Sequence, residues 1–293
     1  MTQHGYGEAV PTFIGSDGME LHYDEFHRGD AGQTGAVIVL GGGAGRHPSY
    51  LGDLAGLAER VHLVVPHLRG VGRSPFPATT EMASFWRQAE DVECLRQQLN
   101  LEQAHLLGHS AGARLAISYA VQFADVLGRM VLVTPPTSGF VEVKSDADVL
   151  IERRRGEPAV DAAIAAWDVG PDGEDDGAFN AWQAKIAPLS YAVWGPAAQN
   201  HAVIGAYSFR ANRAYFSVPP PEDLAARFGE SVAKTLVIAG ADDCITGVAP
   251  VVALSELVSR GSIAMIDHCG HYPWIEQPAA FRAVLDPFLC RLA

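Results

Sequence analysis

Short apolar runs alternate with segments of helical spacing along most of this chain. Ala36–Leu40 contains only Ala, Val, Ile and Leu, and similar runs follow at 61–65, 104–107, 130–133, 235–239 and 262–266. Runs without alternating polar residues are typical of strands buried on both faces of a parallel sheet. We therefore predict an α/β fold, with a mostly parallel sheet covered by helices on both faces.

Other patterns frame this predicted core. Residues 10–14 and 20–27 have strand character on either side of a Gly-Ser-Asp-Gly turn, which predicts an opening hairpin. Residues 80–99 have the spacing of one long amphipathic helix, with Thr80 as its N-cap. Residues 278–292 predict a closing helix.

The segment from 137 to 232 has a different composition and hydrophobic pattern. It contains no buried strand run, and it is rich in alanine and in aromatic residues. A strand-like run resumes only at residue 235. We predict that 137–232 forms a helical cap, inserted into a core domain made of residues 1–136 and 233–293.

The most informative motif is Gly-His-Ser-Ala-Gly at residues 108–112, which has the form G-x-S-x-G. It lies between a predicted strand and a helix-like segment. A strand that passes directly into a helix holds the Ser110 hydroxyl on a strained turn at the carboxyl edge of the sheet. An unassisted hydroxyl is a poor nucleophile near neutral pH, so this placement matters. We predict that Ser110 is a catalytic nucleophile.

A serine nucleophile needs a base, and the base needs a carboxylate to orient it. The last two predicted strands are followed by Asp242 and Asp243, and by His268 and His271. Both loops leave the sheet at the edge where Ser110 is presented. We assign Asp243 as the acid, because it lies far enough past its strand to turn back, and Asp242 stays an alternative. We assign His271 as the base and interpret His268 as a loop residue.

The oxyanion of a tetrahedral intermediate needs two preorganised N–H donors. We expect one from the backbone of Ala111 and the other from the glycine run at 41–45, where we favour Gly43. That run lacks the Lys-Ser or Lys-Thr pair and the G-x-G-x-x-G spacing of phosphate-binding loops.

Charge and hydropathy exclude some kinds of binding partner. The formal net charge is -13 and no basic run offsets it, so we expect no nucleic-acid partner. No apolar run approaches the roughly 20 residues that span a bilayer, and residues 1–10 lack a signal-peptide pattern. We expect a cytoplasmic protein that acts on a small molecule without a membrane partner, and a homo-oligomer stays open.

Taken together, these features resemble the α/β hydrolase superfamily over nearly the whole chain, and within it the prolyl iminopeptidase-like branch. The matching pieces are the glycine run at 41–45, the Arg-Gly-Val-Gly-Arg-Ser run at 69–74, the elbow at Ser110, and the loops of Asp243 and His271. In that branch the glycine run typically reads H-G-G-P-G and the elbow G-G-S-W-G, and this chain departs from both patterns. At 69–74 we expect the two arginines to pin a tight loop rather than to act in catalysis.

The site residues and the resemblance imply a serine hydrolase that cleaves a carboxylic ester, lactone, thioester or amide through an acyl-enzyme on Ser110. We expect no metal and no organic cofactor. Trp167, Trp182 and Tyr215 of the cap are candidates to line an apolar substrate pocket.

Two alternatives remain at this stage. A prolyl or aminoacyl iminopeptidase would also need a cap carboxylate to hold the free amine of its substrate, and the candidates are Glu152, Glu157, Glu174 and Asp175. A protein from another class would keep the fold without hydrolysis, as a ligand-binding protein, a lyase or a cyclase.

Overall fold

A computed structural model describes residues 11–27 and 35–289 of the chain. Its strands are β1 (Thr12–Ile14), β2 (Glu20–Phe26), β3 (Ala36–Leu40), β4 (His62–Pro66), β5 (Ala104–His109), β6 (Leu127–Val133), β7 (Thr235–Gly240) and β8 (Gly261–Ile266). They form one eight-stranded sheet in the order β1-β2-β4-β3-β5-β6-β7-β8. Only the β1–β2 and β2–β4 pairs are antiparallel among these strands, which confirms the predicted mostly parallel sheet.

Helices connect the strands from β3 to β8, because parallel neighbours need a crossover rather than a tight turn. The α-helices are α1 (Gln88–Gln98), α2 (Ala111–Gln122), α3 (Ala147–Glu152), α4 (Pro158–Val169), α5 (Asp176–Ile186), α6 (Pro196–Ala202), α7 (Phe209–Tyr215), α8 (Leu224–Gly229), α9 (Ala249–Leu257), α10 (Pro273–Glu276) and α11 (Pro278–Leu289). Short 3-10 helices are η2 (Pro48–Leu51), η3 (Leu57–Glu59), η4 (Thr80–Ala83), η5 (Ala124–Val126) and η6 (Ala187–Ser190).

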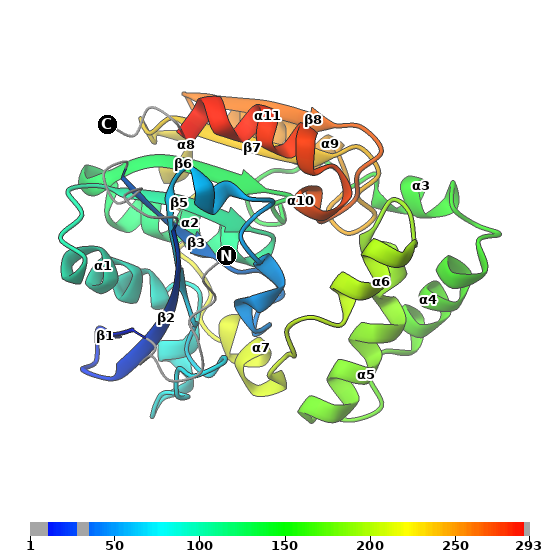
Figure 1. The fold of residues 1–293 in the computed structure, drawn as a ribbon, viewed down its shortest axis with the longest axis horizontal. Helices are drawn as coiled ribbons and strands as arrows, with labels where there is room; N and C mark the ends of the chain where they lie inside the picture. The colour runs from blue at the N-terminus through cyan, green and yellow to red at the C-terminus, as the bar shows by residue number, and fades with distance from the viewer. Residues whose placement is uncertain (1–10, 28–34, 290–293) are drawn as a thin grey trace.

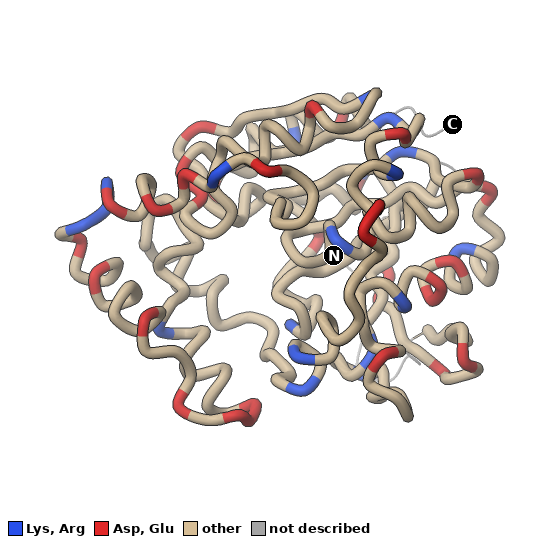
Figure 2. The backbone as a smooth tube through the Cα atoms, turned by 180° about the vertical axis from the view of Figure 1, so that it is seen from behind, with Lys and Arg blue, Asp and Glu red and all other residues tan. Residues whose placement is uncertain are grey.

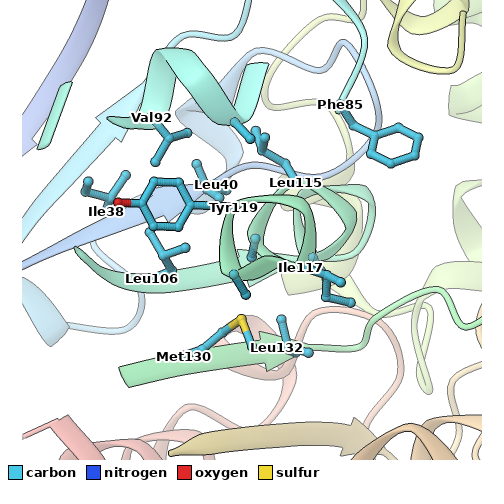
Figure 3. Close-up of a cluster of buried hydrophobic side chains, with 14 of the residues drawn as sticks. Ile38, Leu40, Phe85, Val92, Leu106, Leu115, Ile117, Tyr119, Met130 and Leu132 are labelled. Atoms are coloured by element: carbon cyan, nitrogen blue, oxygen red, sulfur yellow. The ribbon is translucent and has the colours of Figure 1, made fainter. Parts of the chain in front are cut away.

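Successive side chains of the central strands point into two different cores. Ile38 and Leu40 of β3 belong to the core that also holds residues of α1 and α2, whereas Val37 and Val39 belong to the core that holds residues of α11. Figure 3 shows the first core, with Tyr119 of α2 beside the strand residues. Both faces of β3 are therefore buried, which explains why its sequence is a continuous apolar run.

Strand β8 differs from the prediction. We expected a buried strand at 262–266, but Ile263 and Met265 are 39% and 40% exposed. The reason is position, because β8 is the last strand of the sheet and pairs only with β7. An apolar run therefore predicted the strand correctly and its burial wrongly.

The long helix predicted at 80–99 is also interrupted. The chain forms η4, then turns extended at Ser84, with φ −72° and ψ 151°, and α1 begins only at Gln88. Phe85 is buried here, and its N–H donates to the Tyr215 carbonyl at 2.9 Å. This tertiary contact outweighs the helical spacing, and Thr80 does not serve as an N-cap.

Arg69 ties the loop after β4 to two other elements. Its guanidinium is fully buried and donates to both carboxylate oxygens of Asp91 in α1, at 2.6 and 2.8 Å. It also donates to Asp17, in the turn between β1 and β2, at 2.8 Å. The expected pinning role thus holds for the contacts of Arg69, whereas Arg73 contributes a backbone N–H to His67.

The helices α3 to α8 lie between β6 and β7 in the chain. Figure 1 shows α3, α4, α5 and α6 grouped beside the carboxyl ends of the strands, which agrees with an inserted helical cap. Leu224 and Phe228 of α8 pack in the main core with α2. The limits of the cap at 137 and 232 stay a prediction, and "cap" below means that segment.

Charged residues are spread over core and cap alike, with acidic positions along the whole tube in Figure 2. Across residues 11–27 and 35–289, none of the helices combines the length and the apolar character needed to cross a membrane.

Candidate active site

Ser110 occupies the turn between β5 and α2, and its backbone is strained. Its φ of 49° and ψ of −124° lie where residues other than glycine are rarely found. Such a conformation costs on the order of 1–3 kcal/mol. The Ser110 N–H donates to the carbonyl of Val133, at the end of β6, at 2.9 Å. The sheet itself therefore supports the strained turn that presents this side chain.

Two glycines allow this turn to form. A side chain at Gly112, in the first turn of α2, would overlap the carbonyl oxygen of Leu40 at the end of β3. A Cβ at Gly42 would lie 2.8 Å from the Cβ of Ser110. The glycine run after β3 and the elbow are thus in direct backbone contact, which a larger residue at either position would prevent.

The structure brings His271 and Asp243 together from different loops. Asp243 follows β7 and His271 follows β8, and the two residues are 1% and 4% exposed. His271 Nδ1 lies 2.9 Å from Asp243 Oδ2. Asp242 makes no side-chain contact of this kind among the described residues, although its N–H donates to the Cys269 carbonyl. The partner of His271 is therefore Asp243, the acid that we preferred.

Asp243 is held as a carboxylate by its surroundings. It accepts hydrogen bonds from the Thr246 hydroxyl at 2.6 Å and from the Ile245 N–H at 2.8 Å, besides the bond from His271. Burial acts to raise the pKa of this carboxyl, but the charge of His271 and these hydrogen bonds bring the pKa below its ordinary value. An ionised Asp243 fixes a proton on Nδ1 of His271 and leaves Nε2 free to act as a base.

The Ser110 hydroxyl makes no hydrogen bond to another described residue, so no direct bond joins it to His271. Nucleophile–base hydrogen bonds are often long in unliganded hydrolases and shorten when substrate binds. Along the chain, the assigned residues come in the order nucleophile, acid and base, which the sequence predicts, and the assigned roles stay predictions.

Two backbone N–H groups remain available near Ser110. Gly43 has φ 74° in the glycine loop, and Ala111 is the first residue of α2. Neither N–H donates to another described residue, whereas the preceding Gly42 N–H is already bonded to the Tyr50 hydroxyl at 2.6 Å. Gly43 and Ala111 therefore stay the predicted oxyanion donors.

Two further charged groups flank this site, the buried Arg46 and the half-buried Glu276, and neither was predicted from the sequence. Arg46 follows the glycine run, and its guanidinium donates to the Tyr272 hydroxyl at 2.9 Å and to the Ile204 carbonyl at 2.7 Å. It also lies over the Tyr50 ring, 4.3 Å from the centroid. No described Asp or Glu pairs with it. Arg46 thus joins the core to the cap, and its place directly after the glycines was the only sequence signal.

Glu276 is the second missed group. It is the last residue of α10, which follows the His271 loop. Its carboxylate accepts N–H bonds from Gly270 at 2.9 Å and Tyr272 at 3.4 Å, the residues on either side of His271. It also accepts the Ala192 N–H of the cap at 2.6 Å. Burial raises the pKa of Glu276 to about 7, against these N–H groups, which lower it. Nothing in the sequence around Glu276 indicated this role.

The three cap residues predicted to contact substrate have different surroundings. Tyr215 is buried, and its hydroxyl donates to the Ala111 carbonyl beside Ser110 at 2.8 Å. Trp182 donates its indole N–H to the Ala166 carbonyl and stacks near Trp167, which is half exposed. The contacts of both tryptophans therefore lie within the α4–α5 pair, and substrate binding by all three residues stays a prediction.

A recess of about 810 Å³ lies at the opposite edge of the sheet, where the strands begin. Ala36, His105, Gly128 and Lys234 are among its lining residues. It is remote from Ser110, and we assign it no part in the chemistry.

In the described part of the chain, no group of three or more His, Cys, Asp or Glu side chains is arranged to hold a metal ion.

Comparison with known proteins gives consistent matches. A family model described as the alpha/beta hydrolase fold matches residues 35–158. The chain is 26% identical over 277 residues to a 2-hydroxy-6-oxo-6-phenylhexa-2,4-dienoate hydrolase of Comamonas testosteroni, covering 92% of this chain and 91% of that protein. A proline iminopeptidase of Heyndrickxia coagulans is 34% identical, but over 109 residues, or 37% of each chain.

Solved structures agree on the architecture. An esterase from Exiguobacterium antarcticum superposes with a TM-score of 0.70 over 96% of this chain and 99% of its own, at 18% sequence identity, which shows a common fold. The iminopeptidase resemblance is thus partial, whereas the hydrolase relatives match along nearly the whole length. From its fold, its family match over residues 35–158 and its full-length relatives, the chain is an enzyme with the α/β hydrolase fold.

Proposed function

We propose that this enzyme is a serine hydrolase in which Ser110 attacks a carbonyl carbon. The observation that carries the proposal is the buried His271–Asp243 pair, 2.9 Å apart, in loops at the same sheet edge as the strained Ser110 turn. Three separate segments, after β5, β7 and β8, leave the sheet at this edge, and we assign to them the nucleophile, the acid and the base. A purely structural role accounts neither for the strained backbone of Ser110 nor for the buried contact between His271 and Asp243.

The proposed reaction follows from these positions. Nε2 of His271 takes the Ser110 proton as Oγ bonds to the carbonyl carbon, and the N–H groups of Gly43 and Ala111 stabilise the oxyanion. His271 then returns that proton to the leaving group, and the carbon–leaving-group bond breaks. A water molecule, deprotonated by His271, attacks the acyl-enzyme, and Ser110 is regenerated as the acid product leaves.

The substrate class has two candidates. A small ester, lactone, thioester or amide requires only the nucleophile, the oxyanion donors and an apolar pocket. A 2-hydroxy-6-oxo-dienoate is favoured by the relative from Comamonas testosteroni, which matches along 92% of this chain. Its 6-oxo group would offer Ser110 the same electrophile, a carbonyl carbon.

The iminopeptidase alternative loses support from the cap. Glu152, Glu157 and Glu174 are exposed and pair with Arg155, Arg154 and Arg213 respectively. Asp175 is exposed and caps α5 through the Ala178 N–H. Among the described residues of the cap, no Asp or Glu is buried. A buried amine-binding carboxylate, which that activity would require, is not among the four candidates.

A fluorophosphonate probe tests the nucleophile directly. The folded wild-type enzyme should be labelled on Ser110, and Ser110→Ala should lose both labelling and turnover. Ser118→Ala is a matched control, because Ser118 lies buried in the same helix and bonds only to the Arg114 carbonyl. Labelling that persists in Ser110→Ala, or a wild-type enzyme that hydrolyses but resists the probe, would overturn the assignment.

A substrate panel separates the classes. Short p-nitrophenyl esters, a 2-hydroxy-6-oxo-dienoate and proline-β-naphthylamide should be assayed side by side. We expect turnover of an ester or of the dienoate and none of the amide. If Ser110→Ala changes only the affinity for a ligand and no substrate turns over, the non-hydrolytic alternative gains and the hydrolase proposal fails.

A further inference from the structure

A continuous chain of hydrogen bonds links the glycine loop to the backbone of His271. The Gly42 N–H donates to the Tyr50 hydroxyl at 2.6 Å. The Tyr50 hydroxyl lies 2.8 Å from Nδ1 of His109, and Nε2 of His109 lies 3.0 Å from the His271 carbonyl. Tyr50 and His109 are 2% and 1% exposed, so water does not compete for these bonds.

The two ends of this chain fix its direction. The Gly42 N–H can only donate and the His271 carbonyl can only accept. Nε2 of His109 must therefore carry a proton, and in a neutral imidazole Nδ1 is then an acceptor, so the Tyr50 hydroxyl donates to it. Every bond is satisfied in this single arrangement, in which His109 is neutral and protonated on Nε2 alone.

The surroundings of His109 keep it neutral. Burial, followed by the neighbouring charge of His271, lowers the pKa of His109 well below its ordinary value, and Arg46 and His201 act in the same direction. The other groups packed on the ring are the Tyr50 and Tyr272 side chains and the indole of Trp274. None of them supplies a negative charge, because burial raises the pKa of the Tyr50 hydroxyl.

The cap holds Tyr50 through a second pair of the same kind. The Tyr191 hydroxyl lies 2.7 Å from Nδ1 of His201, and Nε2 of His201 lies 2.8 Å from the Tyr50 carbonyl. The same argument makes His201 a neutral donor to that carbonyl. The backbone of Tyr50 is thereby held from the cap, while its hydroxyl reaches into the core.

We propose that Tyr50 and His109 are positioning residues, which hold the glycine loop in the orientation that presents the Gly43 N–H to the oxyanion. The inference rests on the proposed function of Ser110. Glycine peptides have a wide choice of backbone conformations, so a loop of consecutive glycines needs an external restraint. The bond from Gly42 to Tyr50 supplies that restraint one residue before the proposed oxyanion donor.

His271 depends less on this chain than the glycine loop does. Its carbonyl also accepts the Thr134 hydroxyl at 3.1 Å, and its N–H donates to the Ser190 carbonyl at 2.8 Å. Losing the bond from His109 leaves two others. The proposal therefore predicts that the larger effect falls on the oxyanion donors, which act in the transition state and contribute little to substrate binding.

Tyr50→Phe tests the restraint, because it removes only the hydroxyl. We expect kcat to fall about tenfold or more with KM changed less than about threefold, since an oxyanion donor is misplaced rather than deleted. The matched control is Tyr119→Phe, which removes an equally buried hydroxyl that donates to Glu93 away from the site, at 2.7 Å. The control should keep wild-type kcat. A wild-type kcat in Tyr50→Phe, or a change confined to KM, would overturn the proposal.

His109 variants provide an independent route if Tyr50→Phe folds poorly. His109→Gln retains an amide donor for the His271 carbonyl and an acceptor for Tyr50, so it should retain most of the activity. His109→Leu, which is similar in bulk but has no polar atom, should lose kcat as Tyr50→Phe does. Equal activity in the two variants would count against a positioning role.

A spectroscopic measurement separates this inference from the proposed function. Nitrogen-15 NMR of the wild-type imidazole should show His109 neutral and protonated on Nε2 from pH 5 to pH 8, whether or not a substrate is found. In Tyr50→Phe, the Gly42 amide should exchange with solvent faster. Protonation on Nδ1 in the wild type would refute the hydrogen-bond chain. If His109 is protonated on Nε2 but the enzyme shows neither turnover nor probe labelling, only the proposed function of Ser110 is refuted.

Discussion

Replacing His201 with glutamine should make the stability of this enzyme less sensitive to acid. His201 is buried at the contact between cap and core, where it donates to the Tyr50 carbonyl and accepts from Tyr191. Burial lowers its pKa from the ordinary 6.5 to about 4. Between these pH values, His201 is therefore protonated in the unfolded chain and neutral in the folded protein. The contribution to stability is complete above about pH 6.5 and is lost as the pH falls toward 4.

The size of the effect follows from the two pKa values. One pKa unit corresponds to about 1.4 kcal/mol, so the full shift of His201 is about 3 kcal/mol. Between pH 7 and pH 5, where the unfolded imidazole becomes charged and the folded one stays mostly neutral, the loss is about 2 kcal/mol. Glutamine keeps an N–H donor for the Tyr50 carbonyl and does not titrate, so His201→Gln should lack this part of the loss.

Urea denaturation followed by circular dichroism at pH 7, 6 and 5 measures the difference. The free energy of unfolding of the wild type should fall by about 2 kcal/mol more than that of His201→Gln between pH 7 and pH 5. His109 titrates in the same direction but is present in both proteins, so its contribution cancels. His268→Asn, which removes an exposed imidazole, is the control for replacing a histidine. Parallel pH dependence in the wild type and His201→Gln would refute the reasoning.

Three further predictions concern the elbow, the loop after β4 and the acid. Gly112→Ala should destabilise the fold by about 1–3 kcal/mol in urea denaturation, because the new methyl group meets the Leu40 carbonyl. Arg69→Met should cost about 3–5 kcal/mol in the same assay, since it leaves the Asp91 carboxylate without its buried partner. Asp243→Asn should lower kcat on the order of 10³–10⁴-fold in a steady-state assay, because His271 loses the partner that fixes its tautomer.

Matched variants give the first two of these predictions a control. Gly41→Ala places its methyl group at an ordinary 3.8 Å from Tyr50 and should change the unfolding free energy far less than Gly112→Ala. Arg155→Met breaks an exposed pair with Glu152 and should cost less than about 1 kcal/mol. Equal losses within either pair of variants would contradict the packing and burial arguments. For Asp243→Asn, retention of more than about a tenth of wild-type kcat would remove the acid from the proposed mechanism.

The sequence was sufficient where local pattern and fold agree. The buried strands read as apolar runs because both faces of residues such as Val37 and Ile38 are covered. The turn at Ser110 was predictable because its five-residue motif lies between a strand and a helix. The loops of Asp243 and His271 follow strands of the same sheet. The direction of parallel strands is what brings these loops to one edge.

The position of a strand within the sheet, and contacts between residues far apart in the sequence, were not predictable in this way. The exposure of Ile263 depends on β8 being the edge strand, which no local pattern records. The break at Ser84 depends on a bond from Phe85 to Tyr215, about 130 residues away in the sequence. Tyr50 and His109 likewise meet only after β3 and β5 have paired. Single residues at these places carry no signal until the tertiary structure is known.

The insertion of the cap between two neighbouring strands has an evolutionary consequence. Strands β6 and β7 pair side by side, with Val133 opposite Ile238, although the cap helices separate them in the chain. The entropy of closing such an insertion grows slowly, by only about 0.6 kcal/mol for each doubling of its length. During evolution, most of α3 to α5 can therefore be lengthened, shortened or replaced, while the sheet and the loops of Ser110, Asp243 and His271 persist. The stretch near Tyr191 and His201 has less freedom, because it also holds the backbone that orders the glycine loop. Substrate preference in such an enzyme can diverge faster than its chemistry.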